Sequence, residues 1–218
     1  MRILQKKVCS LFSMIIFMSD IICVTNRKLC MEPFIERIKK IAKAHPRGII
    51  LREKDMQPEA YIKLASEVMD ICKKEGVNCI LHSFTDAARE LRCPNIHLPL
   101  KQLRALSRSE KIEFKEIGTS CHSVEEAVEA QELGCTYIIA GHIFETDCKK
   151  GLPGRGHEFL KKVRESVDIP VYAIGGISPE NVREIRGDKA AGACLMSSLM
   201  NCPDVSKLLK SMEKKDEI

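Results

Sequence analysis

The segment Ile169-Pro-Val-Tyr-Ala-Ile-Gly-Gly-Ile177 decides the fold of this chain. Its apolar, β-branched run Val171–Ile174 is long enough for a buried strand and too short for a helix. Gly175 and Gly176 follow, and Ser178-Pro-Glu180 then has the capping serine, first-turn proline and early acid of a helix start. A strand, two glycines and a helix N-terminus together allow backbone N–H groups to close on a phosphate.

The next expected strand ends in a similar loop, where Ala193–Met196 runs into Ser197 and Ser198. Taken alone, a glycine pair is equally typical of a tight turn that needs small residues. Two such loops on consecutive strands, near the end of a chain that repeats βα units, favour the phosphate site of a (β/α)8 barrel. We therefore predict that Gly175, Gly176, Ser197 and Ser198 bind phosphate.

From Asp20 onward, short apolar runs alternate with amphipathic stretches, and no linker interrupts them. The expected strands are Ile21–Thr25, Gly48–Leu51, Asn78–His82, Asn95–Leu98, Glu116–Thr119, Thr136–Ala140, Val171–Ile174 and Ala193–Met196. The expected helices are Glu32–Ala44, Pro58–Glu75, Thr85–Leu91, Leu100–Leu106, Ser123–Leu133 (with a capping box from Ser123 to Glu126), His157–Ser166, Pro179–Arg186 and Pro203–Lys214. Eight strand–helix units predict a single (β/α)8 TIM barrel. The alternative, a doubly wound open sheet, requires GxGxxG in the first turn, where Thr25-Asn-Arg27 stands.

Composition narrows the class of protein. The 218 residues suit one domain, and 44% hydrophobic with 30% charged residues is typical of a soluble globular protein. A net charge of +5, spread over the expected helices, and 5% aromatic residues argue against a nucleic-acid partner. The eleven cysteines contain no CxxC pair and are dispersed, so we expect reduced thiols in a cytoplasmic protein and no structural zinc site.

Residues 1–18 precede the first expected strand of the barrel. A basic start and the apolar run Val8–Met18 imitate a secretory signal, but no small-residue cleavage pattern precedes the strand expected at Asp20. The run is also shorter than the ~20 residues that span a bilayer, so no membrane partner is expected. We interpret residues 1–18 as an over-extended or disordered N-terminus, and residues 19–218 as the barrel.

Chemistry in such barrels lies at the C-terminal ends of the strands. This rule selects Arg52 and Lys54, His82 and Ser83, Pro99, Ser120 and His122, the loop 141–156, and the glycines and serines named above. The set offers cations and phosphate-binding loops, but no evident pair of carboxylates.

Arg52 and Lys54 are predicted to bind a phosphate or carboxylate, Arg52 by a two-pronged fork. Surface ion pairs with Glu53 or Asp55 are the alternative interpretation. Thr146 and Lys149 lie in a glycine-rich loop suited to act as a lid. His97 and His142 are interpreted as structural, and the role of His82 is left open.

Four motifs occur in order across residues 20–200: Leu51-Arg-Glu-Lys-Asp55, Ile117-Gly-Thr-Ser-Cys-His-Ser123, Gly141-His-Ile-Phe-Glu-Thr146 with Lys149, and Ala173-Ile-Gly-Gly-Ile177. In these motifs the chain resembles the thiamine phosphate synthase superfamily. The resemblance implies an enzyme of thiamine biosynthesis that acts on a small phosphorylated thiazole. The oligomeric state is left open.

Two branches of this superfamily differ at the metal. The synthases join a pyrimidine pyrophosphate to a thiazole phosphate with Mg²⁺ held by aspartates, in Asn-Asp-Arg after strand 3 and His-Leu-Gly-Gln-x-Asp after strand 4. This chain has His82-Ser-Phe84 and His97-Leu-Pro-Leu-Lys-Gln102 there, so both carboxylates are missing. Mg²⁺ is usually held by one or two carboxylates, and a serine and a glutamine are poor replacements.

The loop 141–156 is more similar to the TenI-type thiazole tautomerases, which aromatise a thiazole phosphate carboxylate. That reaction needs a general acid–base group and no metal, and the resemblance makes His122 the candidate proton shuttle. In the alternative interpretation, His122 caps the next helix or only forms local hydrogen bonds. The main prediction is therefore a metal-independent tautomerase without cofactor, with Ser120 among the substrate-binding residues. The alternatives are a divergent synthase, which would need magnesium, and a non-catalytic binder of a phosphorylated thiazole or thiamine phosphate.

Overall fold

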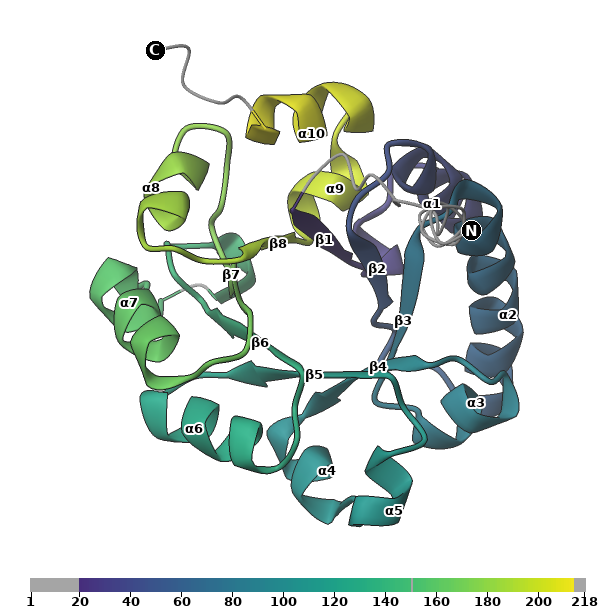
Figure 1. Ribbon diagram of the computed structural model, residues 1–218. Coiled ribbons are helices and arrows are strands. Elements are labelled where there is room, and N and C mark those ends of the chain that lie inside the picture. The colour runs from purple at the N-terminus through teal and green to yellow at the C-terminus, as the bar shows by residue number, and fades with distance from the viewer. Residues whose placement is uncertain (1–19, 150, 214–218) are drawn as a thin grey trace, which may run out of the picture.

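The computed structural model describes residues 20–149 and 151–213, and eight parallel strands close into a barrel in sequence order. In Figure 1, β1 lies beside β8, which completes the ring. The prediction of a single (β/α)8 TIM barrel is confirmed, and the interpretation of residues 1–18 lies outside the described residues. The strands are β1 (Ile21–Val24), β2 (Gly48–Leu51), β3 (Asn78–His82), β4 (Asn95–Pro99), β5 (Glu116–Cys121), β6 (Tyr137–Gly141), β7 (Val171–Ile174) and β8 (Gly192–Leu195).

Helices surround the strands on the outside of the barrel (Figure 1). They are η1 (Arg27–Leu29), α1 (Phe34–Lys43), α2 (Pro58–Glu75), α3 (Thr85–Glu90), α4 (Leu100–Ala105), α5 (Arg108–Lys111), α6 (Val124–Glu132), η2 (Asp147–Lys149), α7 (Gly156–Ser166), α8 (Val182–Gly187), α9 (Ser197–Asn201) and α10 (Val205–Glu213). The sequence did not predict α5 or α9. Within the described part of the chain, no helix is both long enough and apolar enough to cross a bilayer.

Strand residues alternate between two apolar cores because successive side chains point to opposite faces. One core lies between the strands and the helices, and the other fills the barrel. In β1, for example, Ile21 and Cys23 pack towards the helices, whereas Ile22 and Val24 pack inside. The interior core consists of Ile22, Val24, Ile50, Ile80, Tyr137, Ile139, Tyr172 and Cys194.

Between β4 and β6 the interior core contains a polar contact, for which β5 makes room. Gly118 leaves room for the ring of Tyr137, since a Cβ on Gly118 would stand 2.0 Å from the Tyr137 Cζ. The Tyr137 hydroxyl lies 3.1 Å from His97 Nδ1, inside the barrel. A glycine on one strand therefore permits a buried tyrosine–histidine contact between its neighbours.

The helix after the glycine pair begins later than predicted, at Val182 rather than Pro179. The Asn181 side chain holds the intervening turn, because its amide donates to the Gly176 carbonyl (2.9 Å) and its oxygen accepts from the Ser178 N–H (2.8 Å). The prediction that Ser178 caps a helix directly behind Gly175 and Gly176 is therefore wrong.

The predicted capping box at α6 is present only in part. Ser123 Oγ accepts from the Glu126 N–H at 3.2 Å, as expected. The Glu126 carboxylate reaches one residue further back and accepts from the His122 N–H at 2.5 Å. The start of α6 is thereby linked to His122.

Candidate functional site

The cationic side of the site follows β2. The Arg52 N–H donates to Thr25 Oγ1 (2.9 Å), and Arg52 continues the inward alternation of Ile50 past the end of the strand. The intervening acid Glu53 is buried and accepts from the Thr25 hydroxyl (2.7 Å) and from Arg27 Nη1 (3.0 Å). Arg27 also donates to both oxygens of Asp55, at 2.7 and 2.9 Å.

Arg27 thus pairs with Glu53 and Asp55, the two acids that alternate with Arg52 and Lys54 in the sequence. Among the described residues, the side chains of Arg52, Lys54 and Lys149 form no ion pair, so the alternative pairing of Arg52 and Lys54 with these acids is wrong. Partial burial, and then the positive charges of Arg52 and Lys149, lower the pKa of Lys54. Lys149, from the loop after β6, therefore shares an electrostatic environment with the cations after β2.

A cavity of about 780 Å³ lies beside Lys149. Four of the residues predicted to bind substrate line it together: Thr146, Lys149, Gly176 and Ser197. Gly175 and Ser198 adjoin this lining without belonging to it. The remaining lining residues are Glu145, Asp147, Gly151, Leu152, Pro153 and Ile177.

The glycine pair allows the loop after β6 to pack closely on β7. Gly175 and Gly176 have φ values of 101° and 65°, which L side chains rarely adopt. A Cβ on Gly175 would lie 2.3 Å from His142 Cβ, and one on Gly176 would lie 2.3 Å from the Glu145 carbonyl oxygen. The Phe144 N–H also donates to the Gly175 carbonyl at 3.0 Å. These glycines therefore let residues 142–145 pack closely on β7, next to residues 145–147, which line the cavity.

His122 lies just beyond β5 with its side chain exposed. Its Nδ1 is 2.8 Å from the Gly141 carbonyl oxygen, which can only accept, so Nδ1 carries the proton of the neutral ring. The lone pair is then on Nε2, which has the form of a general base. The same contact permits the alternative interpretation, in which His122 joins β5 to β6.

Two buried histidines form a polar layer at the ends of β3 and β4. His82 Nδ1 is 2.6 Å from Ser83 Oγ, His97 Nε2 is 2.9 Å from Ser120 Oγ, and the two rings are 5.6 Å apart. Burial lowers the pKa of His82 to about 2 and that of His97 to about 3, and the charges of Lys54 and Arg52 act in the same direction. Both rings are therefore uncharged at neutral pH.

Sequence reasoning did not connect His97 with the site. In the structure, His97 bonds to Ser120, which was predicted to bind substrate. The alternation of side chains along β4 could have predicted this position. Ile96 and Leu98 face the helices, so His97 must face the barrel interior.

The donors at the ends of β3 and β4 do not fit a magnesium ion. Ser83 and Gln102 occupy the positions where the resemblance places aspartates, and the Ser83 hydroxyl is already bonded to His82. Gln102 lies exposed on α4. Over residues 20–149 and 151–213, no group of three or more His, Cys, Asp or Glu side chains is placed to hold a metal ion.

The chain is a parallel (β/α)8 barrel with cations and a glycine-walled cavity at the C-terminal ends of its strands, which is where barrels of this class commonly bind phosphate. The family described as "Thiamine monophosphate synthase" matches residues 21–199. The chain belongs to this thiamine-biosynthesis family.

Individual relatives agree with that assignment. The chain is 32% identical to the thiamine-phosphate synthase of Fusobacterium nucleatum subsp. nucleatum, covering 88% of this chain and 94% of the relative. It is also 32% identical to the enzyme of the same name from Syntrophomonas wolfei subsp. wolfei, covering 84% and 88%. The structure of thiamine phosphate pyrophosphorylase from Pyrococcus furiosus is similar with a TM-score of 0.76 and 26% identity, covering 88% and 92%.

Proposed function

We propose that this protein is a thiamine phosphate synthase, which joins a pyrimidine diphosphate to a thiazole phosphate. The observation that carries the proposal is the presence of two groups of residues suited to anions at one end of the barrel. Arg52 and Lys54 form one, and the cavity lined by Thr146, Gly176 and Ser197 forms the other. The names of the relatives also favour the synthase over the tautomerase predicted from the sequence.

In this proposal, each anion has its own side of the barrel mouth. The thiazole phosphate lies in the cavity, and the diphosphate lies against Arg52 and Lys54. The new bond from the pyrimidine to the thiazole replaces the bond to the diphosphate, which leaves with the bonding electron pair. Cations fixed beside the leaving group stabilise the charge that develops on it, and the guanidinium of Arg52 can bind two phosphate oxygens at once.

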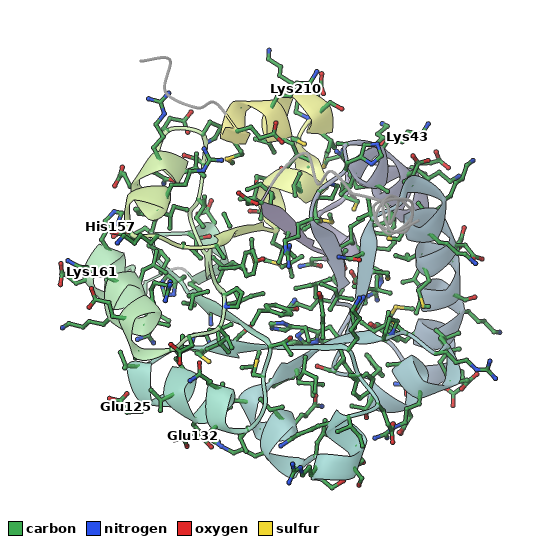
Figure 2. The ribbon with its side chains drawn as sticks, in the orientation of Figure 1. Lys43, Glu125, Glu132, His157, Lys161 and Lys210 are labelled. Atoms are coloured by element: carbon green, nitrogen blue, oxygen red, sulfur yellow. The ribbon has the colours of Figure 1, made fainter. Side chains whose placement is uncertain are left out.

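The test is an assay with both substrates, in which thiamine phosphate is measured by chromatography. Arg52→Gln is expected to lower kcat about 100-fold or more, the scale seen when one preorganised donor to a transition state is lost. Lys161→Ala is the control, because Lys161 points away from the barrel on α7 (Figure 2). Absence of product from the unaltered protein with both substrates would reject the proposal.

A thiazole tautomerase is the second candidate, because His122 has the geometry of a general base. Its Nδ1–H is fixed on the Gly141 carbonyl, and Nε2 is left to exchange a proton with a substrate carbon. An NMR time course with the thiazole phosphate carboxylate tautomer tests this function. Conversion that falls about 10²–10⁴-fold in His122→Ala would support it. If the unaltered protein gives no conversion, this second candidate is excluded.

A further inference from the structure

The segments after β3 and β4 carry neutral side chains at the positions where the family carries acids. At the two positions where the family carries aspartates, Ser83 and Gln102 bring no charge. The neighbouring histidines bring none at neutral pH either, because their rings are buried. In addition, Glu53 and Asp55 pair with Arg27 and not with Arg52 or Lys54.

We propose that this chain binds the diphosphate group through its own cations, Arg52, Lys54 and Lys149, without a divalent metal ion. The proposal rests on the proposed function for the identity of the anion. In a metal-dependent site, two carboxylates offset the charge of the ion that they hold. Here no such carboxylates stand after β3 and β4, and three cations face the anion directly.

The charge around these three side chains opposes a metal ion. Partial burial lowers the pKa of Lys54, and the positive charges of Arg52 and Lys149 lower it further. A divalent cation placed among them would be repelled, whereas an anion with three or four negative charges would bind and relieve the mutual repulsion. Binding of that anion would raise the pKa of Lys54 again and keep its amine protonated.

The available oxygen atoms lead to the same conclusion. Mg²⁺ prefers hard oxygen ligands in octahedral geometry and gives up its water reluctantly. Ser83 Oγ is engaged with His82 Nδ1 at 2.6 Å, and imidazole nitrogen suits transition metals rather than Mg²⁺. Lys149 lines the cavity together with two acids, Glu145 and Asp147. These acids are the one competing set of ligands in that cavity lining, and the experiment must address them.

The experiment is calorimetric titration of the full chain with inorganic pyrophosphate, first in EDTA and then in excess MgCl₂. We expect binding in EDTA and no tighter binding with Mg²⁺. Lys54→Met is expected to weaken binding in EDTA about tenfold or more, since it removes a hydrogen bond from a charged donor. Lys161→Met removes the same charge from the outer face of α7 and should leave binding unchanged (Figure 2). Circular dichroism checks that both variants are folded.

The outcomes separate this inference from the proposed function. Binding that appears only with Mg²⁺ and is lost in Asp147→Asn would overturn the inference and assign the metal to the cavity acids. Absence of binding in both buffers would overturn it as well. Binding in EDTA without product in the two-substrate assay would support the inference and reject the synthase. Product formation together with Mg²⁺-dependent binding would reject the inference alone.

Discussion

Gly118 is a single residue whose missing side chain shapes the barrel interior. A Cβ there would lie 2.0 Å from the Tyr137 Cζ, and the Tyr137 ring is buried and bonded to His97, so moving it away would break that contact. Gly118→Ala is therefore expected to lower the free energy of unfolding by about 1–3 kcal/mol, the usual range for overpacking. Urea unfolding followed by circular dichroism measures this change.

Gly187→Ala is the matched control. Gly187 ends α8, and a Cβ there would meet no atom within 4 Å. Alanine favours a helix by up to about 1 kcal/mol over glycine, so this variant should be as stable as the unaltered protein or more stable. Equal losses in both variants would contradict the packing explanation.

Individual site residues were predictable where a rule of position applies. Arg52 and Lys54 follow the end of β2, His122 follows the end of β5, and Ser120 is the penultimate residue of β5. Their positions agree with the rule, and their roles stay predictions. The partner of Glu53 was not predictable, because Arg27 lies 26 residues away in the chain and only closure of β1 against β2 brings them together.

At the scale of elements, His157 joins α7 to α8 (Figure 2). Its Nδ1 lies 2.6 Å from Asp188 Oδ2 and its Nε2 lies 2.8 Å from Glu184 Oε2. The hydrogen bond to Asp188, followed by that to Glu184, raises the pKa of His157 against the opposing effect of burial. A raised pKa in the folded state means that the stabilisation is complete below the unfolded pKa of about 6.5, and is lost as the pH rises through the folded value.

His157→Gln is therefore expected to be less stable than the unaltered protein at pH 6, with a smaller difference at pH 9. The difference at pH 6 should stay below about 1 kcal/mol because the pair is partly exposed to solvent. Urea midpoints at the two pH values measure it. A difference that is equal at both would show that the ion pairs contribute nothing.

Most elements were predicted from the sequence, and the exceptions have physical causes. The bounds of β2, β3, β7 and α2 were predicted to the residue because turn residues flank clear apolar patterns. The four-residue α5 and five-residue α9 are too short to show a helical period. The late start of α8 depends on a side-chain contact of Asn181 that no local pattern reveals.

For the whole molecule, the buried histidines predict sensitivity to acid. A folded pKa lowered to about 3 for His97 means that the unfolded chain takes up a proton first as the pH falls below about 6.5. Stability contributed by the neutral ring is therefore present above that value and declines towards pH 3.

His97→Gln should remove part of this decline. Between pH 7 and pH 4.5, the unaltered protein is expected to lose about 2.5 kcal/mol more stability than the variant, because each pKa unit corresponds to about 1.4 kcal/mol. Parallel urea series at the two pH values give the comparison. Identical losses in both proteins would mean that His97 does not link folding to protonation.

The alternation of charges after β2 has a consequence for how this site can change. Residues 52 and 54 are cations that follow the end of β2, while residues 53 and 55 are acids that pair with Arg27. Residues 52–55 carry no net charge together. The sign of the electrostatic potential at the barrel mouth therefore depends on which of them occupy the positions of residues 52 and 54. Deletion of one residue before Arg52 would exchange the two sets and place acids where the cations now stand. Evolution can replace individual side chains here, but a shift of one position would invert the electrostatics of the whole entrance.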